Sequence, residues 1–172
     1  MRVVVVETEH PPAVGASLAR EYAALADRLF VAGARAVERV KYPSLGDVDR
    51  ADALVLGGSY APWSVHDELA LARLGTMVLQ YDRPVLGICA GMQLLAQFAG
   101  GRLARASGGP VVGFTEIEVL HRDDLLAGLG DRAVVYQHHT DEVVELPPAL
   151  RVLARSSACA VEVIADPVRR WW

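Results

Sequence analysis

The stretch PVLGICAGMQLLAQFAGG, residues 84–101, contains the most informative motif of the chain. A short apolar run leads to Cys89, which stands between Gly87 and Gly91, and a helical pattern follows. The form G-x-C-x-G between a strand and a helix is typical of a nucleophile elbow, here with a thiol in place of a serine hydroxyl. The alternative is a buried cysteine at a strand end, with glycines that serve packing alone.

An elbow of this kind makes specific physical demands. The sharp turn lifts the nucleophile out of the sheet, strains its backbone and leaves no room for flanking side chains. The helix that begins there directs its free N–H groups at the sulfur, so we expect the pKa of the Cys89 thiol to be lowered. We also expect the N–H group of Ala90 to hold an oxyanion during acyl transfer.

Strands and helices alternate over the first hundred residues. The pattern predicts strands at 2–7, 34–42, 51–59 and 83–89, and helices at 17–33, 65–82 and 90–101. Such alternation predicts an α/β fold with a mostly parallel central sheet and helices on both faces.

The chain after residue 101 is richer in strands. Apolar runs predict strands at 111–120, 133–146, 151–157 and 159–165, with one or two helical turns at 123–130. No linker separates the two halves, so we expect a single domain over residues 1–172 with a strand-rich C-terminal part.

The composition is that of an ordinary globular protein, with 52% hydrophobic residues and a net charge of −4. This charge disfavours nucleic acid and anionic membrane surfaces as partners. Two cysteines are too few for a disulfide framework, which favours the cytoplasm, and Cys159 is expected to be inert core. No zinc-type spacing and no nucleotide-binding glycine motif occurs, so we expect no metal and no cofactor.

A glycine pair ends another predicted strand, in VLGGS at 55–59. Neighbouring parallel strands deliver their C-terminal loops to the same edge of a sheet. Gly57 and Gly58 are therefore expected close to Cys89, with a backbone N–H directed at developing negative charge. A plain turn is the alternative.

Together these motifs resemble the class I (triad-type) glutamine amidotransferases. GICAGMQLLAQFAGG is similar to the family's nucleophile motif, and LVLGGS to its oxyanion strand, although Gly-Gly-Ser stands where the family usually has Gly-Gly-Pro. GGPVVGFTEIEV and VVYQHHTDEVVELPPALRVLARSS resemble the segments that follow. Four blocks in the family's order cover most of residues 2–165, and the resemblance implies a flavodoxin-like sheet.

The resemblance also implies a reaction. Cys89 would attack the side-chain amide of L-glutamine, ammonia would pass to a synthetase partner, and water would hydrolyse the γ-glutamyl thioester. The implied oxyanion donors are Gly58 and Ala90. The implied substrate-binding positions are Gly57, Gln93, His138, Thr140 and Asp141, with the backbone around His139 lining the same pocket.

The family's base and its orienting carboxylate are absent from this sequence. They belong to a His-Pro-Glu late in the family pattern, whereas this chain ends DPVRRWW. We therefore expect a domain that is incomplete at its C-terminus, with exposed tryptophans. Two alternatives stay open: an inactive product that ends here, or recruitment of a nearby histidine, above all His139, as the base.

Three functions remain after these observations. The first is a glutaminase that feeds ammonia to a synthetase, whose acceptor the motifs do not identify. The second is a catalytically inactive module that binds glutamine or a partner protein. The third is a γ-glutamyl hydrolase that uses Cys89 without ammonia transfer.

Overall fold

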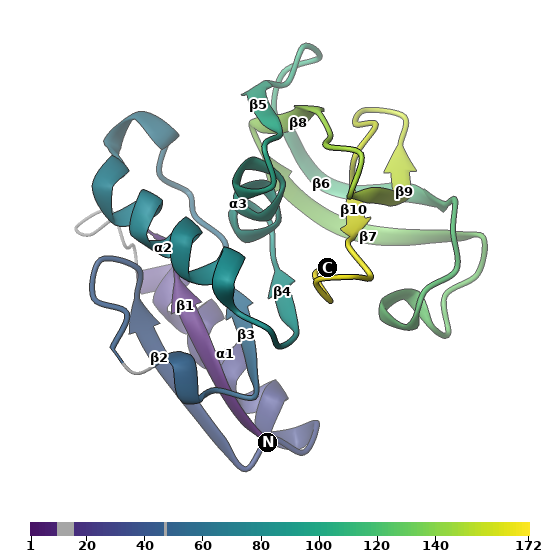
Figure 1. Ribbon diagram of the computed structural model, residues 1–172. Coiled ribbons are helices and arrows are strands. Elements are labelled where there is room, and N and C mark those ends of the chain that lie inside the picture. Colours follow the sequence, from purple (N-terminus) through teal and green to yellow (C-terminus); the bar gives the residue numbers. More distant parts are fainter. Residues whose placement is uncertain (10–15, 47) are drawn as a thin grey trace. The chain divides into compact units, whose positions relative to one another are not determined.

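The computed structural model describes residues 1–9, 16–46 and 48–172. The chain forms two compact units, Met1–Leu94 and Leu95–Trp172, each with its own strands (Figure 1). The boundary between the units falls inside helix α3 (Ala90–Phe98).

The first unit is built on a four-stranded parallel sheet in the order β2-β1-β3-β4. Its strands are β1 (Arg2–Glu7), β2 (Ala36–Lys41), β3 (Ala53–Leu56) and β4 (Val85–Gly87). All four valines of β1 are buried, because this strand lies between two others and both of its faces are covered. A strand in that position needs a continuous β-branched run, which is what the sequence supplies.

Helices cover both faces of this sheet, with α1 (Ala16–Val31) behind it and α2 (Glu68–Gln80) in front of it in Figure 1. Tyr22 of α1 belongs to a core cluster with Val3 and Val5. Asp67 caps α2, since its carboxylate accepts the Ala70 N–H at 3.0 Å. Short 3-10 helices lie at η1 (Val48–Arg50) and η2 (Trp63–Val65). The predicted parallel sheet with helices on both faces is confirmed.

The turn from β4 into α3 lies against the end of β3. The Ile88 N–H donates to the Leu56 carbonyl oxygen at 2.8 Å. A Cβ atom on Gly91 would overlap that same oxygen, and one on Gly87 would lie 2.5 Å from the Met92 nitrogen. The two glycines beside Cys89 are therefore required by close backbone approach, as the motif predicted.

The second unit is antiparallel. One sheet has the order β10-β9-β6-β7, and β5 pairs separately with β8. Its elements are β5 (Arg102–Arg105), β6 (Val111–Val119), η3 (Asp124–Leu126), β7 (Arg132–His139), β8 (Asp141–Glu145), β9 (Arg151–Ser156) and β10 (Val163–Ala165). Ile117, Leu153 and Ala154 lie in its core cluster. This agrees with the predicted strand-rich C-terminal part.

Several element boundaries differ from the sequence-based expectation. The run 133–146, predicted as one strand, is two strands that break at Thr140, where the chain leaves one sheet as β7 and enters the other pair as β8. Apolar alternation continues through such a change of partner and does not reveal it. Of the run 159–165, only Val163–Ala165 is a strand, and Cys159 precedes it.

The expectation of two exposed tryptophans is wrong. Trp171 is 0% exposed, and its backbone N–H and carbonyl exchange hydrogen bonds with those of Asp166 at 3.0 and 2.9 Å. The indole N–H of Trp172 donates to the Asp123 carboxylate at 2.7 Å. The Trp172 ring is thus held by contacts inside the second unit, and the Trp171 ring is buried.

Among the helices of the described residues, none combines the length and the apolar character that crossing a bilayer requires.

We predict that Gly91→Ala lowers the free energy of unfolding by about 1–3 kcal/mol, the usual cost of overpacking. The new methyl group must displace the helix from the Leu56 carbonyl, which outweighs a gain of ~1 kcal/mol in helix propensity. Urea denaturation followed by circular dichroism measures the change. Gly108→Ala is the matched control, because a Cβ there meets nothing within 4 Å. Equal losses in the two variants would contradict the close packing.

Candidate active site

Cys89 occupies the turn between β4 and α3 in a strained conformation. Its φ angle is 54°, in the left-handed region that residues other than glycine rarely adopt. Such a backbone costs on the order of 1–3 kcal/mol and persists only where the surrounding structure enforces it. The residue is exposed. The structure thus presents the thiol at the carboxyl end of the parallel sheet, as the elbow motif predicted.

Two backbone N–H groups, those of Ala90 and Ser59, hydrogen-bond to the Cys89 sulfur and lower its pKa. Burial by the protein atoms that crowd the sulfur is the larger influence, and the net effect raises the pKa of the thiol, although part of the residue is open to solvent. The expectation of a lowered pKa is therefore wrong. Cys89 is a protonated thiol at neutral pH and needs a base before it can attack a substrate.

The glycine pair at the end of β3 lies directly beside the elbow, since a Cβ on Gly58 would lie 3.5 Å from the Cys89 Cβ. Both carbonyl groups of the pair are anchored away from the thiol. The Thr8 hydroxyl donates to the Gly57 oxygen at 2.7 Å, and the Tyr22 hydroxyl donates to the Gly58 oxygen at 2.5 Å.

Anchoring a carbonyl also fixes the N–H group of the same peptide. In a planar trans peptide the C=O of one residue and the N–H of the next point in opposite directions. The bound Gly57 and Gly58 oxygens therefore orient the N–H groups of Gly58 and Ser59, and the Ser59 N–H is the one that reaches the sulfur. The role of Gly58 as an oxyanion donor stays a prediction.

A buried carboxylate holds the rest of this loop. Glu9 is 2% exposed. Its two oxygens accept the Ser59 hydroxyl at 2.9 Å and the Tyr60 N–H at 2.8 Å. The Ser59 hydroxyl also lies 3.3 Å from Nε2 of the buried His66. Charge-assisted hydrogen bonds of this kind are strong, so Glu9 sets the position of the Ser59 N–H that faces Cys89.

Gln93, a predicted substrate-binding residue, lies in the first turn of α3. Its backbone N–H donates to the Cys89 carbonyl at 3.1 Å, and its side chain is buried. The helix thus places this amide one turn away from the nucleophile. Its contact with substrate stays a prediction.

The remaining predicted positions belong to the second unit. The exposed His138 and the half-buried His139 end β7, and the Thr140 hydroxyl donates to the Asp141 carboxylate at 3.2 Å. Both ring nitrogens of His139 face groups of the same unit: Nδ1 donates to the Asp141 carbonyl at 3.2 Å, and Nε2 lies 3.8 Å from the Glu162 carboxylate. Recruitment of His139 as a base stays a prediction.

Within the first unit the arrangement suits acyl transfer. The sulfur of Cys89 stands at a helix N-terminus, and oriented N–H groups converge on it, an arrangement that suits stabilisation of an oxyanion. Sequence reasoning missed Thr8, Glu9, Tyr22 and Ser59, which orient those N–H groups. The clearest available signal was the acidic Glu9, two residues after the end of a buried strand, where a charge needs a partner.

Comparison with known proteins identifies a family. The family model for class-I glutamine amidotransferases matches residues 24–169. The glutamine-hydrolyzing GMP synthase subunit from Pyrococcus abyssi is 42% identical over 85 residues, which are 49% of this chain and 45% of that protein. The subunit of the same name from Methanothrix thermoacetophila is 40% identical over 121 residues, 69% of this chain and 62% of that protein.

A solved structure extends the likeness to almost the whole chain. A Thermoplasma acidophilum protein proposed to be a GMP synthase subunit superposes with a TM-score of 0.84 at 27% sequence identity. The match covers 99% of this chain and 80% of that one. Against the Pyrococcus abyssi protein, by contrast, the matched part spans less than half of the relative's length.

We predict a stability loss at high pH that depends on Tyr22. Burial raises the pKa of Tyr22 from 10.0 to about 12, so the folded state keeps the proton that the unfolded state releases at lower pH. The stabilisation is complete below pH 10 and disappears as the pH rises from there to about 12. Denaturation at several pH values should show a shallower decline in this window for Tyr22→Phe than for the wild type.

The matched control for this prediction is Tyr136→Phe, which removes a tyrosine that is exposed in β7. With Tyr22 intact, this control should keep the wild-type decline. A steep decline that survives in Tyr22→Phe would show that the Tyr22 hydroxyl is not buried against the Gly58 carbonyl.

Proposed function

The chain belongs to the class-I glutamine amidotransferase family, and on that basis we propose that it hydrolyses the side-chain amide of glutamine through a Cys89 γ-glutamyl thioester. The single observation that carries the proposal is the left-handed turn at Cys89, with the Ala90 and Ser59 N–H groups directed at its sulfur. A core cysteine requires neither feature.

The chemistry follows from this geometry. A base removes the thiol proton, and the sulfur adds to the amide carbon of glutamine. The negative oxygen that results is held by backbone N–H groups, for which Ala90 and the 58–59 loop are the donors we propose. The carbon–nitrogen bond then breaks, ammonia leaves with a proton from the conjugate acid of the base, and a thioester remains. Water attacks the thioester, which releases glutamate and regenerates the thiol.

The base has a larger role here than in a site with a preformed thiolate, because it must first remove the thiol proton. Burial raises the pKa of Cys89, so proton removal contributes to the barrier of the first step. Recruitment of His139 for this step remains an alternative, which a His139→Ala variant tests. General base assistance of this type is worth roughly 10²–10⁴-fold in rate.

The names of the relatives support the identity of the ammonia acceptor. We propose that ammonia passes to a synthetase partner of the GMP synthase type, because three of the similar proteins carry the name of a GMP synthase subunit. The two compact units then act as one amidotransferase domain, since the family model extends across both. We further propose a cytoplasmic protein without nucleic-acid or membrane partners.

We predict that a chloroketone analogue of glutamine adds once to the chain, at Cys89. The sulfur displaces chloride and forms a thioether, which intact-mass and peptide mass spectrometry detect. Glutamine should slow the labelling by competition, and Cys89→Ala should abolish it. Gln80→Ala, a change at the exposed end of α2, is the control and should label at the wild-type rate.

Labelling at Cys159 in place of Cys89 would contradict the proposed site. Labelling at Cys89 without any release of glutamate from glutamine would instead favour the inactive binding module. Release of glutamate that disappears in His139→Ala would support the recruited base.

A further inference from the structure

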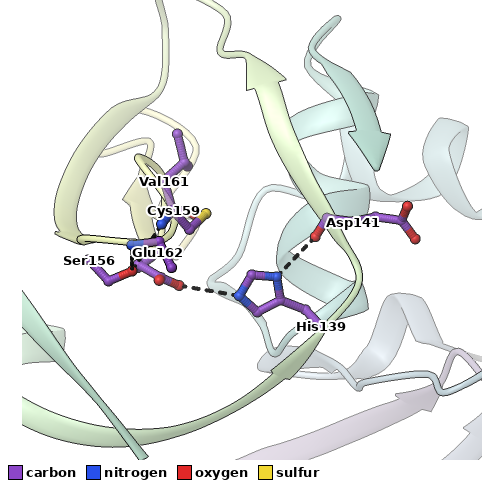
Figure 2. A network of polar contacts seen from close by, with 7 residues as sticks. His139, Asp141, Ser156, Cys159, Val161 and Glu162 are labelled. Atoms are coloured by element: carbon purple, nitrogen blue, oxygen red, sulfur yellow. Dashed lines mark hydrogen bonds and ion pairs between the residues drawn. The ribbon is translucent and has the colours of Figure 1, made fainter. Parts of the chain in front are cut away.

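A second group of reactive side chains lies in the second unit, where His139, Cys159 and Glu162 come together (Figure 2). One ligand-capable atom from each lies within 4.8 Å of the other two: a ring nitrogen, the sulfur and a carboxylate oxygen. Cys159 is 4% exposed, and the Glu162 side chain is 8% exposed. The His139 side chain is 13% exposed, so the group is largely shielded from water.

The protonation pattern of His139 is set by its neighbour. Nδ1 lies 3.2 Å from the Asp141 carbonyl oxygen, which only accepts hydrogen bonds, so Nδ1 carries a proton. In the neutral ring Nε2 is then a bare lone pair, and it lies 3.8 Å from the Glu162 carboxylate. Figure 2 shows that carboxylate pointing at the ring. Two electron-pair donors face each other, and a cation between them would satisfy both.

Two buried atoms of the cluster lack any hydrogen-bond partner. They are Nε2 of His139 and Oε1 of Glu162. Buried polar atoms are rarely left in this state, because each costs about 1–3 kcal/mol. The Cys159 thiol does have a hydrogen-bond partner, since it donates to the Val161 carbonyl oxygen at 3.3 Å. The unpartnered nitrogen and oxygen are the observation that points to a ligand.

We propose that His139 Nε2, Cys159 Sγ and a Glu162 carboxylate oxygen bind a divalent transition-metal cation of the Zn²⁺ class. Thiolate, imidazole and carboxylate are the three ligand types that zinc accepts. The backbone carbonyl on Nδ1 is the usual outer partner of a metal-binding histidine, because it fixes the ring and directs Nε2 at the metal. The proposal does not depend on the chemistry of Cys89, but it competes with the base role of His139, since a metal-bound Nε2 has no lone pair left for a proton.

The geometry requires a small contraction. Ligand atoms of one tetrahedral zinc ion lie roughly 3.3–3.8 Å apart, as bond lengths of 2.0–2.3 Å dictate. The His139–Glu162 distance of 3.8 Å already reaches this range, and the widest separation in the cluster is at most 4.8 Å. The Glu142 carboxylate interacts with the Cys159 thiol, and it or a water molecule completes the coordination. Binding forms the metal–sulfur bond and releases the thiol proton to solvent.

One of the three residues, Cys159, is reached by a surface pocket. This pocket of about 580 Å³ is lined by the segment 156–160 together with Arg132 and Arg155. A buried site needs such an entry path if metal is to exchange with solvent. The sequence does not reveal the site, because His139 ends β7 whereas Cys159 lies 20 positions later, between β9 and β10, so no short metal-binding motif results.

Co²⁺ titration of the reduced chain tests the proposal, with Zn²⁺ as the competitor. We expect a thiolate-to-cobalt charge-transfer absorption that saturates at one equivalent and disappears when Zn²⁺ is added. Zn²⁺ should also raise the unfolding temperature, because it binds only the folded chain. Cys159→Ser should remove the absorption, and His139→Gln and Glu162→Gln should weaken affinity by at least about 10-fold, the effect of even an outer-shell partner.

Cys89→Ala is the matched thiol control and should keep the absorption unchanged. Circular dichroism of each variant establishes that the fold is retained, and the conservative Glu162→Gln exchange keeps the shape of the site if Cys159→Ser does not fold. Absence of a cobalt band in the wild-type chain, or loss of the band in Cys89→Ala, would overturn the proposal. In the first case His139 and Glu162 would form an imidazolium–carboxylate pair and nothing more.

Discussion

The left-handed backbone at Cys89 is the constraint on which the site depends. This conformation costs on the order of 1–3 kcal/mol, and it is maintained because contacts on either side hold the chain in place. On one side the Ile88 N–H is bound to the end of β3, and on the other the first turn of α3 packs so closely on β3 that only glycine fits at position 91. Contacts with the central sheet therefore hold Cys89 in this strained conformation.

Polar anchoring of the neighbouring loop is the other constraint on the site. Thr8 and Tyr22 bind the two glycine carbonyls, and the buried Glu9 binds the residues after them. The resulting site is organised in the directions of its N–H groups, while the thiol itself is kept neutral by burial. Such a site stabilises the negative charge that develops in the transition state more than it stabilises the neutral thiol of the resting state. This difference in stabilisation is what favours catalysis.

The parts of this structure that sequence could predict are those with a local pattern. The alternation of strands and helices over the first hundred residues predicted the parallel sheet, and the Gly87–Cys89–Gly91 spacing predicted the elbow. The Thr140 break, the Glu9 anchor and the His139–Cys159–Glu162 cluster depend on contacts between distant residues, which periodicity does not encode. The direction of the Cys89 pKa was wrong for the same reason. A helix N-terminus is visible in the sequence, whereas the burial that outweighs it arises only in the folded chain.

A crystal structure of the chain carrying a glutamine-derived ketone on Cys89 would show whether the backbone N–H groups beside this residue bind an oxyanion. We expect the ketone oxygen to lie about 2.7–3.1 Å from the Ala90 nitrogen and from a backbone nitrogen of residues 58–59. We also expect Cys89 to keep its positive φ. A ketone oxygen that contacts neither nitrogen, or a Cys89 that relaxes to an ordinary backbone conformation, would contradict these expectations.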